Sequence, residues 1–240
     1  MTLHYKLLDK VVELSKEHIH VFLLNLNNYD DITLYDYLSE DEKERADKLK
    51  VKQKRKQFIV SRSVLRKLIS NCIDKNYDEI KFYYAEHDKP FIKEKHNNKT
   101  IKFNISHSED YILIALTLEN RVGIDIEKIN KKIDAESLSK RFFSQNEYEY
   151  LKSIEINKKL DAFYTIWTKK EAFIKATGKG VAFGLDKFSV TSDKQIISKI
   201  DIGNEINSIE EWFCFELMPV DEYKTALVTD VKDVELIFYQ

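Results

Sequence analysis

The two halves of this chain follow the same pattern, and this internal repeat limits the possible folds more than any other feature. Three elements of the 240 residues recur at a nearly constant shift of about 105 positions: Ile19 matches Ile124, Ser39 with Glu42 matches Ser144 with Glu147, and Phe58 matches Phe163. Amphipathic patterns often overlay by chance, and identities between the copies are few. A near-constant offset across three elements nevertheless favours a duplicated unit.

Each copy contains a strand, a helical hairpin and further strands. In the first copy, the S-x-x-E capping box at Ser39 predicts the start of a helix. The other expected elements are a buried strand at 19–26, a long basic helix at 52–69, and strands at 80–85, 101–105 and 111–118. We therefore expect an α+β fold of two similar halves, residues 1–120 and 121–240, related by a pseudo-twofold axis. The active site is expected in the cleft between them.

Two carboxylates mark the first strand of the second half, VGIDIE. Alternate side chains of a strand share a face, so Asp125 and Glu127 point the same way. Two carboxylates about 4 Å apart repel by about 4 kcal/mol at an effective dielectric of about 20, so a cation is expected beside them. The alternative is a half-buried strand with a solvated acidic face. The first half has His20 and Phe22 at these positions, so an acidic cluster would belong to one half only.

A second unusual stretch, WTKKEAFIKATGKG, has the spacing of a helix. Trp167, Glu171 and Lys175 would follow one another along one side of it, at every fourth residue. An ordinary amphipathic helix with one ion pair is the alternative. Lys170 would project from the apolar face, so its ammonium must either reach solvent or meet a buried carboxylate. The first half has Arg66 where the second has Glu171.

Composition narrows the classes of function. The residues are 43% hydrophobic and 33% charged with a net charge of −2, which does not favour broad electrostatic binding to nucleic acid or to an anionic membrane. An anionic ligand would have to be held locally. No apolar run approaches the roughly 18 residues of a membrane span, and the amino-terminal stretch carries too many charges for a signal peptide. We therefore expect a cytoplasmic protein in which Cys72 and Cys214 are free thiols.

Three motifs in one order, FNISHS, VGIDIE and WTKKEAFIKATGKG, resemble those of the Sfp-like 4′-phosphopantetheinyl transferases. The segments DKP, RFFS and LDKFSV also have counterparts in that family, so the resemblance covers most of the chain. It implies an enzyme that transfers the 4′-phosphopantetheine moiety of coenzyme A to a serine of an apo acyl or peptidyl carrier protein and releases 3′,5′-ADP. The carrier could serve fatty-acid, polyketide or nonribosomal-peptide biosynthesis.

The resemblance also implies roles for the charged residues of the second half. It assigns Asp125, Glu127 and Glu171 to Mg²⁺, and Lys175 to a phosphate of coenzyme A. Glu171, Lys175 and Asp125 would then be catalytic, because bound Mg²⁺ neutralises the pyrophosphate and stabilises the leaving 3′,5′-ADP. Glu171 is one candidate for the general base. A carboxylate that binds Mg²⁺ has a lowered pKa and is a weaker base, so a metal-bound water is the other candidate.

Nucleotide contacts are expected in the first half. The resemblance assigns four of its side chains to coenzyme A, namely Lys89, Ser106, His107 and Arg45. Arg45 would contact the 3′-phosphate. A second basic position of the family falls on Glu42, so Lys43 beside it is the replacement, and Arg62 and Arg66 are the reserves.

Two other functions compete with this assignment. A metal-dependent phosphodiesterase or nuclease also gathers carboxylates, but the sequence contains no second acidic cluster and no basic aromatic stripe for a nucleic-acid track. A catalytically inactive module that binds carrier proteins would have no need of the complete set of Asp125, Glu127, Glu171 and Lys175. Because one chain carries both halves, we expect the enzyme to be active as a monomer.

Overall fold

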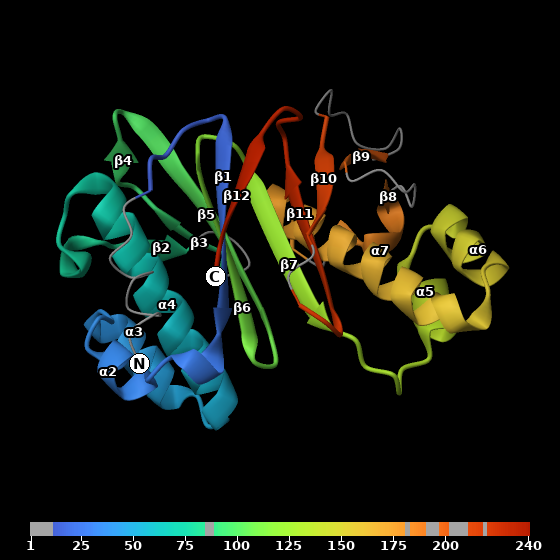
Figure 1. Ribbon diagram of the computed structural model, residues 1–240, viewed down its shortest axis with the longest axis horizontal. Coiled ribbons are helices and arrows are strands. Elements are labelled where there is room, and N and C mark those ends of the chain that lie inside the picture. Colours follow the sequence, from blue (N-terminus) through green and yellow to red (C-terminus); the bar gives the residue numbers. More distant parts are fainter. Residues whose placement is uncertain (1–11, 85–88, 181–182, 191–196, 202–210, 218–219) are drawn as a thin grey trace. The chain divides into compact units, whose positions relative to one another are not determined.

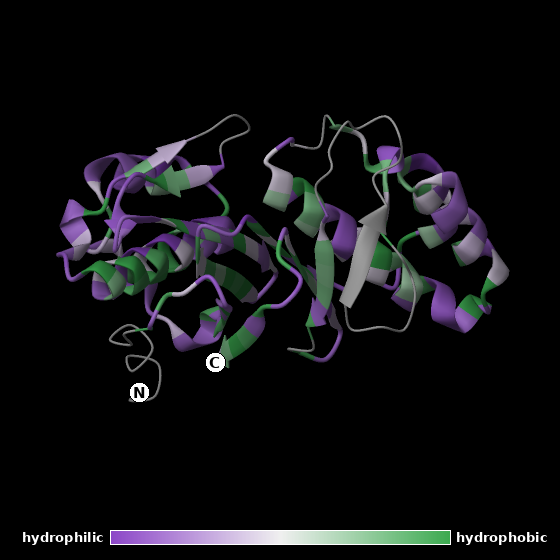
Figure 2. Ribbon diagram, turned by 90° about the horizontal axis from the view of Figure 1, so that it is seen from above, coloured by the Kyte–Doolittle hydropathy of each residue, from purple (hydrophilic) through white to green (hydrophobic). Residues whose placement is uncertain are grey.

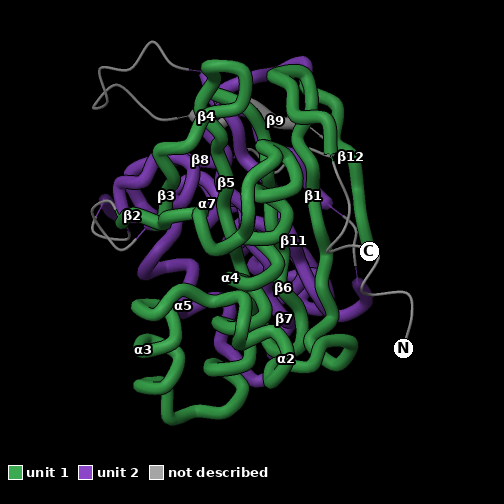
Figure 3. The backbone as a smooth tube through the Cα atoms, turned by 90° about the vertical axis from the view of Figure 1, so that its left-hand side faces the viewer, with its two compact units in different colours: residues 1–85, 90–119, 234–240 green, residues 86–89, 120–233 purple. Residues whose placement is uncertain are grey.

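The computed structural model describes residues 12–84, 89–180, 183–190, 197–201, 211–217 and 220–240. Figure 3 colours two compact units: unit 1 contains residues 1–85, 90–119 and 234–240, and unit 2 contains residues 86–89 and 120–233. Each unit has a five-stranded sheet and its own helices, which confirms the expected α+β fold of two similar halves. The cleft between the halves stays a prediction. Within the described ranges, none of the helices is both long and apolar enough to cross a membrane.

The sheet of unit 1 is built around β1 (His18–Asn25). Its strand order is β12 (Glu235–Tyr239), β1, β6 (Tyr111–Leu118), β5 (Lys99–Ser108) and β4 (Lys95–His96). β1 pairs antiparallel with β6 and parallel with β12, so the last strand of the chain completes the first sheet (Figure 1). The ring of Tyr239 stacks on Phe22 with centroids 4.6 Å apart. This packing is why residues 234–240 group with unit 1, whereas the sequence division at 120 placed them in the second half.

The main helix of unit 1 is α4 (Lys52–Ile73), whose apolar side packs on the sheet. Figure 2 shows apolar and polar residues alternating around the helices. Ile59 and Leu65 of α4 share one buried core with Phe22 and Ile114 of the sheet. The smaller elements are η1 (Leu26–Asn28), α2 (Asp31–Tyr35), α3 (Glu40–Lys48), η2 (Tyr77–Glu79), β2 (Phe82–Tyr84) and β3 (Pro90–Ile92).

The sheet of unit 2 is antiparallel throughout and begins with the acidic strand. Its order is β7 (Val122–Lys128), β11 (Tyr223–Thr229), β10 (Phe213–Leu217), β9 (Ile197–Asp201) and β8 (Ser189–Val190). β7 lies at one edge and pairs with β11, where Ala226 lies opposite Asp125 and Lys224 lies opposite Glu127. The expected strand VGIDIE is therefore confirmed, with its two carboxylates on one face.

The described helical elements beside this sheet are α5 (Ala135–Phe142), α6 (Gln145–Ser153), α7 (Ile156–Thr177) and η5 (Leu185–Lys187). α7 packs along β7 and β11. It ends at Gly178, whose φ of 71° is the left-handed conformation that glycine adopts at no steric cost, and whose N–H donates to the Ile174 carbonyl at 2.9 Å. The predicted helix WTKKEAFIKAT is thus the second half of α7.

The repeat holds in the local structure, with one correction. Both capping boxes form, at Ser39 and at Ser144, and each is followed by a 22-residue helix. The sequence comparison matched Arg66 with Glu171. In the structure Arg66 corresponds to Lys170, because both are fully buried cations that pair with the glutamate of the capping box. The shift from Arg66 to Lys170 is therefore one position shorter than the shift from Ser39 to Ser144 between the two capping boxes.

Candidate functional site

The acidic site depends on how closely α7 approaches β7. Gly123, Asp125 and Glu127 share the strand face that α7 covers. A Cβ added at Gly123 would collide with the carbonyl oxygen of Ala172 and the nitrogen of Ala176, and would lie 2.9 Å from the Ala176 Cα. The helix backbone thus lies directly on the strand backbone at this point. Sequence analysis missed this role, although a glycine inside a strand pattern indicates a close backbone approach.

Lys175 and Asp125 form the central ion pair of the site. The Lys175 Nζ lies 2.6 Å from the Asp125 Oδ1, and the two side chains are 27% and 3% exposed. The sequence offered Glu171, four residues earlier on the helix, as the ordinary partner of Lys175. The structure places the ammonium beside the strand carboxylate, because Asp125 is buried and needs a neighbouring cation more than half-buried Glu171 does.

Glu171 lies close enough to this pair to be influenced by both charges. Burial raises the pKa of Glu171 above its ordinary value, the negative charge of Asp125 raises the pKa further, and the Lys175 ammonium acts in the opposite direction. The site therefore holds two carboxylates and one ammonium. A carboxylate with a raised pKa accepts a proton at neutral pH more readily than an ordinary one.

The donor chemistry of this cluster suits a hard cation. Carboxylate oxygens are the ligands that Mg²⁺ prefers, and a cation would relieve the repulsion between Asp125 and Glu171. Glu127 shares the strand face with Asp125, and Lys224 opposite it pairs with Asp161 at 2.8 Å. Within the described ranges, however, no three His, Cys, Asp or Glu side chains gather closely enough to form a metal site. The structure thus brings two of the three expected ligands together.

A second charged cluster lies in unit 1 and joins α3, α4 and β2. The Arg45 Cζ lies 5.6 Å from the ring centroid of Phe58 and 5.4 Å from that of Tyr84. Arg62 lies over the same two rings, at 5.7 Å from each. The Arg62 Nη1 is buried and has no hydrogen-bond partner among the described residues, and burial lowers the pKa of its guanidinium. Two guanidinium groups held together in this way are suited to an anion.

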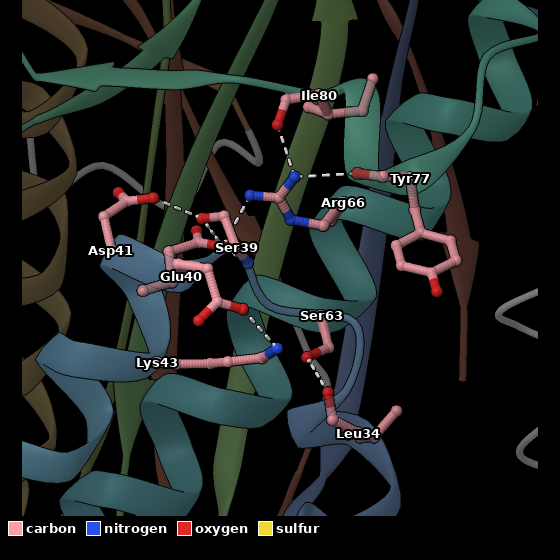
Figure 4. Close-up of polar contacts among 10 residues, drawn as sticks. Leu34, Ser39, Glu40, Asp41, Lys43, Ser63, Arg66, Tyr77 and Ile80 are labelled. Atoms are coloured by element: carbon pink, nitrogen blue, oxygen red, sulfur yellow. Dashed lines mark hydrogen bonds and ion pairs between the residues drawn. The ribbon is translucent and has the colours of Figure 1, made fainter.

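The sequence named Arg62 only as a reserve, because a basic helix face is usually solvated. Aromatic residues four positions before it and on β2 are the signal that it is covered. Lys43, the replacement expected at the 3′-phosphate, has other partners. It forms an ion pair with Glu40 (Figure 4), and its Nζ lies 2.8 Å from the Glu40 Oε1 and 5.9 Å from the Tyr35 ring centroid. The structure brings Arg62, and not Lys43, to Arg45.

The remaining coenzyme A residues are spread over two faces and both units. β5 continues through Ser108, so Ser106 and His107 lie within the strand that was expected to end at residue 105. Neighbouring strand residues point to opposite faces, and Ser106 is buried whereas His107 is exposed. Lys89 groups with unit 2, where its Nζ donates to the Lys175 carbonyl at the negative end of α7.

Gly123→Ala tests the close approach of α7. The added methyl group is expected to destabilise the protein by about 1–3 kcal/mol or more, because the atoms that it meets belong to the helix backbone. Urea unfolding measures the loss. Ile126→Val, on the opposite face of β7, is the control and should cost only about 0.5–1.5 kcal/mol. Rescue of Gly123→Ala by Ala172→Gly would contradict this account, since that change removes no colliding atom.

Glu171→Gln is expected to raise the melting temperature at neutral pH. The pKa of Glu171 in the folded state lies above its ordinary value of 4.5, so the stability that its protonated form contributes is present below the unfolded pKa and is lost as pH rises through the folded pKa. Glutamine has no proton to lose. The gain over the unmodified protein should therefore grow from about pH 4 to pH 7.

Thermal unfolding at both pH values measures this gain. The exposed Glu155→Gln is the control and should show no such growth. A gain that shrinks with pH would mean that attraction to Lys175 outweighs burial and the charge of Asp125.

Comparison with known proteins identifies the family of the chain. The model of the 4′-phosphopantetheinyl transferase N-terminal domain matches residues 29–119, and that of the 4′-phosphopantetheinyl transferase superfamily matches residues 121–228. The chain is 32% identical over 190 residues to the 4′-phosphopantetheinyl transferase HetI of Nostoc sp., which covers 79% of this chain and 77% of that protein.

Two Bacillus subtilis proteins are similarly related. One, a 4′-phosphopantetheinyl transferase, is 31% identical over 192 residues, covering 79% of this chain and 81% of its own length. The other, Sfp, is 34% identical over 154 residues, covering 64% and 66%. The expected family is confirmed: this chain belongs to the 4′-phosphopantetheinyl transferase superfamily and is an enzyme of that class.

Proposed function

We propose that this enzyme transfers the 4′-phosphopantetheine moiety of coenzyme A to a serine of an apo acyl or peptidyl carrier protein, with release of 3′,5′-ADP. The observation that carries the proposal is the cluster of Asp125, Glu171 and Lys175, which stands in the unit that matches the superfamily model. An inactive binding module would have no use for two carboxylates held against each other beside a lysine.

Asp125, Glu127 and Glu171 are the proposed ligands of Mg²⁺. Bound Mg²⁺ would supply positive charge to the pyrophosphate of coenzyme A. Lys175, which is partly exposed, is the proposed phosphate contact from the protein itself. Its ammonium already lies beside Asp125, so it can meet a phosphate oxygen at the edge of the acidic cluster with little rearrangement.

Glu171 is the proposed acceptor of the proton that leaves the carrier serine. Without a bound metal, burial and the neighbouring charge of Asp125 both raise the pKa of Glu171. Mg²⁺ held by Glu171 would lower that pKa, so a metal-bound water is the other candidate for the base. The serine oxygen attacks the phosphorus that bears the pantetheine arm, the bond from that phosphorus to the bridging oxygen breaks, and 3′,5′-ADP leaves with that oxygen.

The 3′-phosphate is proposed to bind Arg45 and Arg62. Support comes from the buried Nη1 of Arg62, which has no hydrogen-bond partner among the described residues, and from the second guanidinium held over the same rings. A phosphate would satisfy both groups through charge-assisted hydrogen bonds. Lys43, Lys89, Ser106 and His107 stay predicted contacts of coenzyme A, and monomeric state and cytoplasmic location stay predictions as well.

Carrier modification is the direct test of this function. A panel of apo acyl and peptidyl carrier proteins is incubated with coenzyme A and Mg²⁺, and intact mass is measured. We expect at least one carrier to gain one phosphopantetheine arm. Asp125→Asn and Glu171→Gln should each slow this gain by about a hundredfold or more, whereas the exposed Glu155→Gln should not. No gain on any carrier, or cleavage of coenzyme A without transfer, would refute the proposal.

Stabilisation by ligands tests the 3′-phosphate contact. Coenzyme A at about 100 times its Kd should stabilise the folded protein by about 2.7 kcal/mol, and dephospho-coenzyme A at the same concentration should stabilise it less. Arg62→Gln should remove most of the difference between the two ligands. Lys43→Gln should preserve it, because the structure brings Arg62, and not Lys43, to Arg45. If instead Lys43→Gln removes the difference and Arg62→Gln preserves it, Lys43 and not Arg62 contacts the 3′-phosphate.

A further inference from the structure

One buried ion pair in each unit has no part in the chemistry proposed above. In unit 1 the Arg66 Nη2 lies 2.6 Å from the Glu42 Oε2, and both side chains are 1% exposed. The Arg66 Nη1 also donates to the carbonyl oxygens of Tyr77, at 2.8 Å, and Ile80, as Figure 4 shows. Glu42 is therefore turned into the protein.

Unit 2 contains a matching arrangement. The Lys170 Nζ lies 2.7 Å from the Glu147 Oε2, and the side chains are 0% and 5% exposed. The same ammonium donates to the carbonyl oxygens of Leu185, at 2.7 Å, and Phe188, at 2.5 Å. Lys170 thus meets a buried carboxylate, which is one of the two outcomes that the sequence allowed.

The two arrangements share three features. Each carboxylate is the third residue of a helix with a capping box and accepts the backbone N–H of the capping serine, at 3.1 Å in unit 1 and 3.0 Å in unit 2. Each cation lies on the 22-residue helix. Each pair of carbonyls belongs to the first residue of a 3₁₀ helix and to the residue that caps its end. We call the Glu42–Arg66 set clamp 1 and the Glu147–Lys170 set clamp 2.

Stability alone does not explain such pairs. Replacing a buried ion pair by apolar residues of similar volume is often neutral or stabilising, whereas a buried pair can hold one specific arrangement. A clamp fixes the rotation of its helix about the helix axis, because the cation must reach three acceptors at once. The clamp then also fixes the direction in which side chains near the cation project from the helix.

The functional residues lie near the clamp cations on the same helices. Glu171 follows Lys170 directly, and Lys175 comes one turn after Glu171 on α7, five residues from Lys170. Arg62 lies one turn before Arg66 on α4, and the Cζ atoms of the two arginines lie 5.3 and 5.2 Å from the ring centroid of Phe82. A small rotation of either helix would move these groups away from their partners.

We propose that the two clamps are positioning devices with separate tasks. Clamp 1 holds Arg62 against Arg45 for the 3′-phosphate, and clamp 2 holds Glu171 and Lys175 against Asp125 for the transfer step. This inference rests on the function proposed above, from which it takes the roles of these residues.

Matched double variants test the separation of tasks. Glu42→Gln with Arg66→Met removes clamp 1, and Glu147→Gln with Lys170→Met removes clamp 2. Glutamine keeps the capping box in both. Loss of clamp 1 should raise the KM for coenzyme A and the Kd of 3′,5′-ADP, measured by calorimetry, about tenfold with kcat within about twofold. Loss of clamp 2 should lower kcat by about tenfold to a hundredfold and change the Kd of 3′,5′-ADP by less than about threefold, because the 3′-phosphate contacts in unit 1 remain.

Three further variants separate positioning from stability. Ile69→Val on α4 and Ile166→Val on α7 remove one methyl group each from buried positions, and should lower the melting temperature without changing Kd or kcat. Arg66→Lys should keep the Kd of 3′,5′-ADP within about threefold, because Lys170 serves the same three kinds of acceptor in unit 2. If the double variant Glu42→Gln with Arg66→Met does not fold, Arg66→Lys serves as the test of clamp 1. Lys170→Arg does so for clamp 2 and should retain most of kcat.

Several outcomes would overturn the proposal. One is that both double variants only lower the melting temperature, as the valine variants do. Another is that each double variant changes the Kd of 3′,5′-ADP and kcat by the same factor. A tighter complex of Glu42→Lys with 3′,5′-ADP would show that position 42 faces the nucleotide and not Arg66. If the unmodified enzyme modifies no carrier, but loss of clamp 1 still weakens 3′,5′-ADP, the proposed function fails while clamp 1 stands.

Discussion

The backbone contact between β7 and α7 at Gly123 is the interaction on which the acidic site depends. Without a Cβ at this position the helix can lie on the strand, with the small residues Ala172 and Ala176 at the contact. Lys175, the neighbour of Ala176, then reaches Asp125 two residues along the strand at 2.6 Å. The distance between strand and helix therefore sets the distance between charges. A motif that looks like a set of ligands is also a packing motif, because its glycine determines where the ligands stand.

The fold places the Glu171 carboxylate where its ionised form is unfavourable. Burial and the charge of Asp125 both disfavour the ionised form of Glu171, and Lys175 offsets only part of this effect. Such strain is expected where function and not stability selects the residues. A pyrophosphate would add negative charge beside two carboxylates, so one ammonium is too little to balance the site. This electrostatic deficit is the physical argument for a divalent cation.

Local patterns predicted the elements well and the partners poorly. Strand alternation placed Asp125 and Glu127 on one face, and helical spacing placed Glu171 near Lys175. The choice of Asp125 as the partner of Lys175 depends on which carboxylate is buried, and burial is a property of the folded unit. The burial of Arg62 was missed for the same reason. Its helix face is basic in sequence, but aromatic rings of α4 and β2 cover its side chain in the folded unit. Such contacts join residues far apart in sequence, where periodicity carries no information.

The repeat shows how chemistry can be added to a scaffold without changing it. Arg66 and Lys170 hold equivalent helices through equivalent acceptors, yet a charge-based comparison paired Arg66 with the next residue, Glu171. In unit 1 the residue after the clamp is Lys67, which lies over the rings of Tyr37 and Tyr77. In unit 2 it is a carboxylate facing Asp125. Because the clamp points one way and its neighbour about 100° away, the inner contact can be kept while the outer residue changes. The outer position is one of several that differ between the units, since unit 1 also has His20 and Phe22 where unit 2 has Asp125 and Glu127.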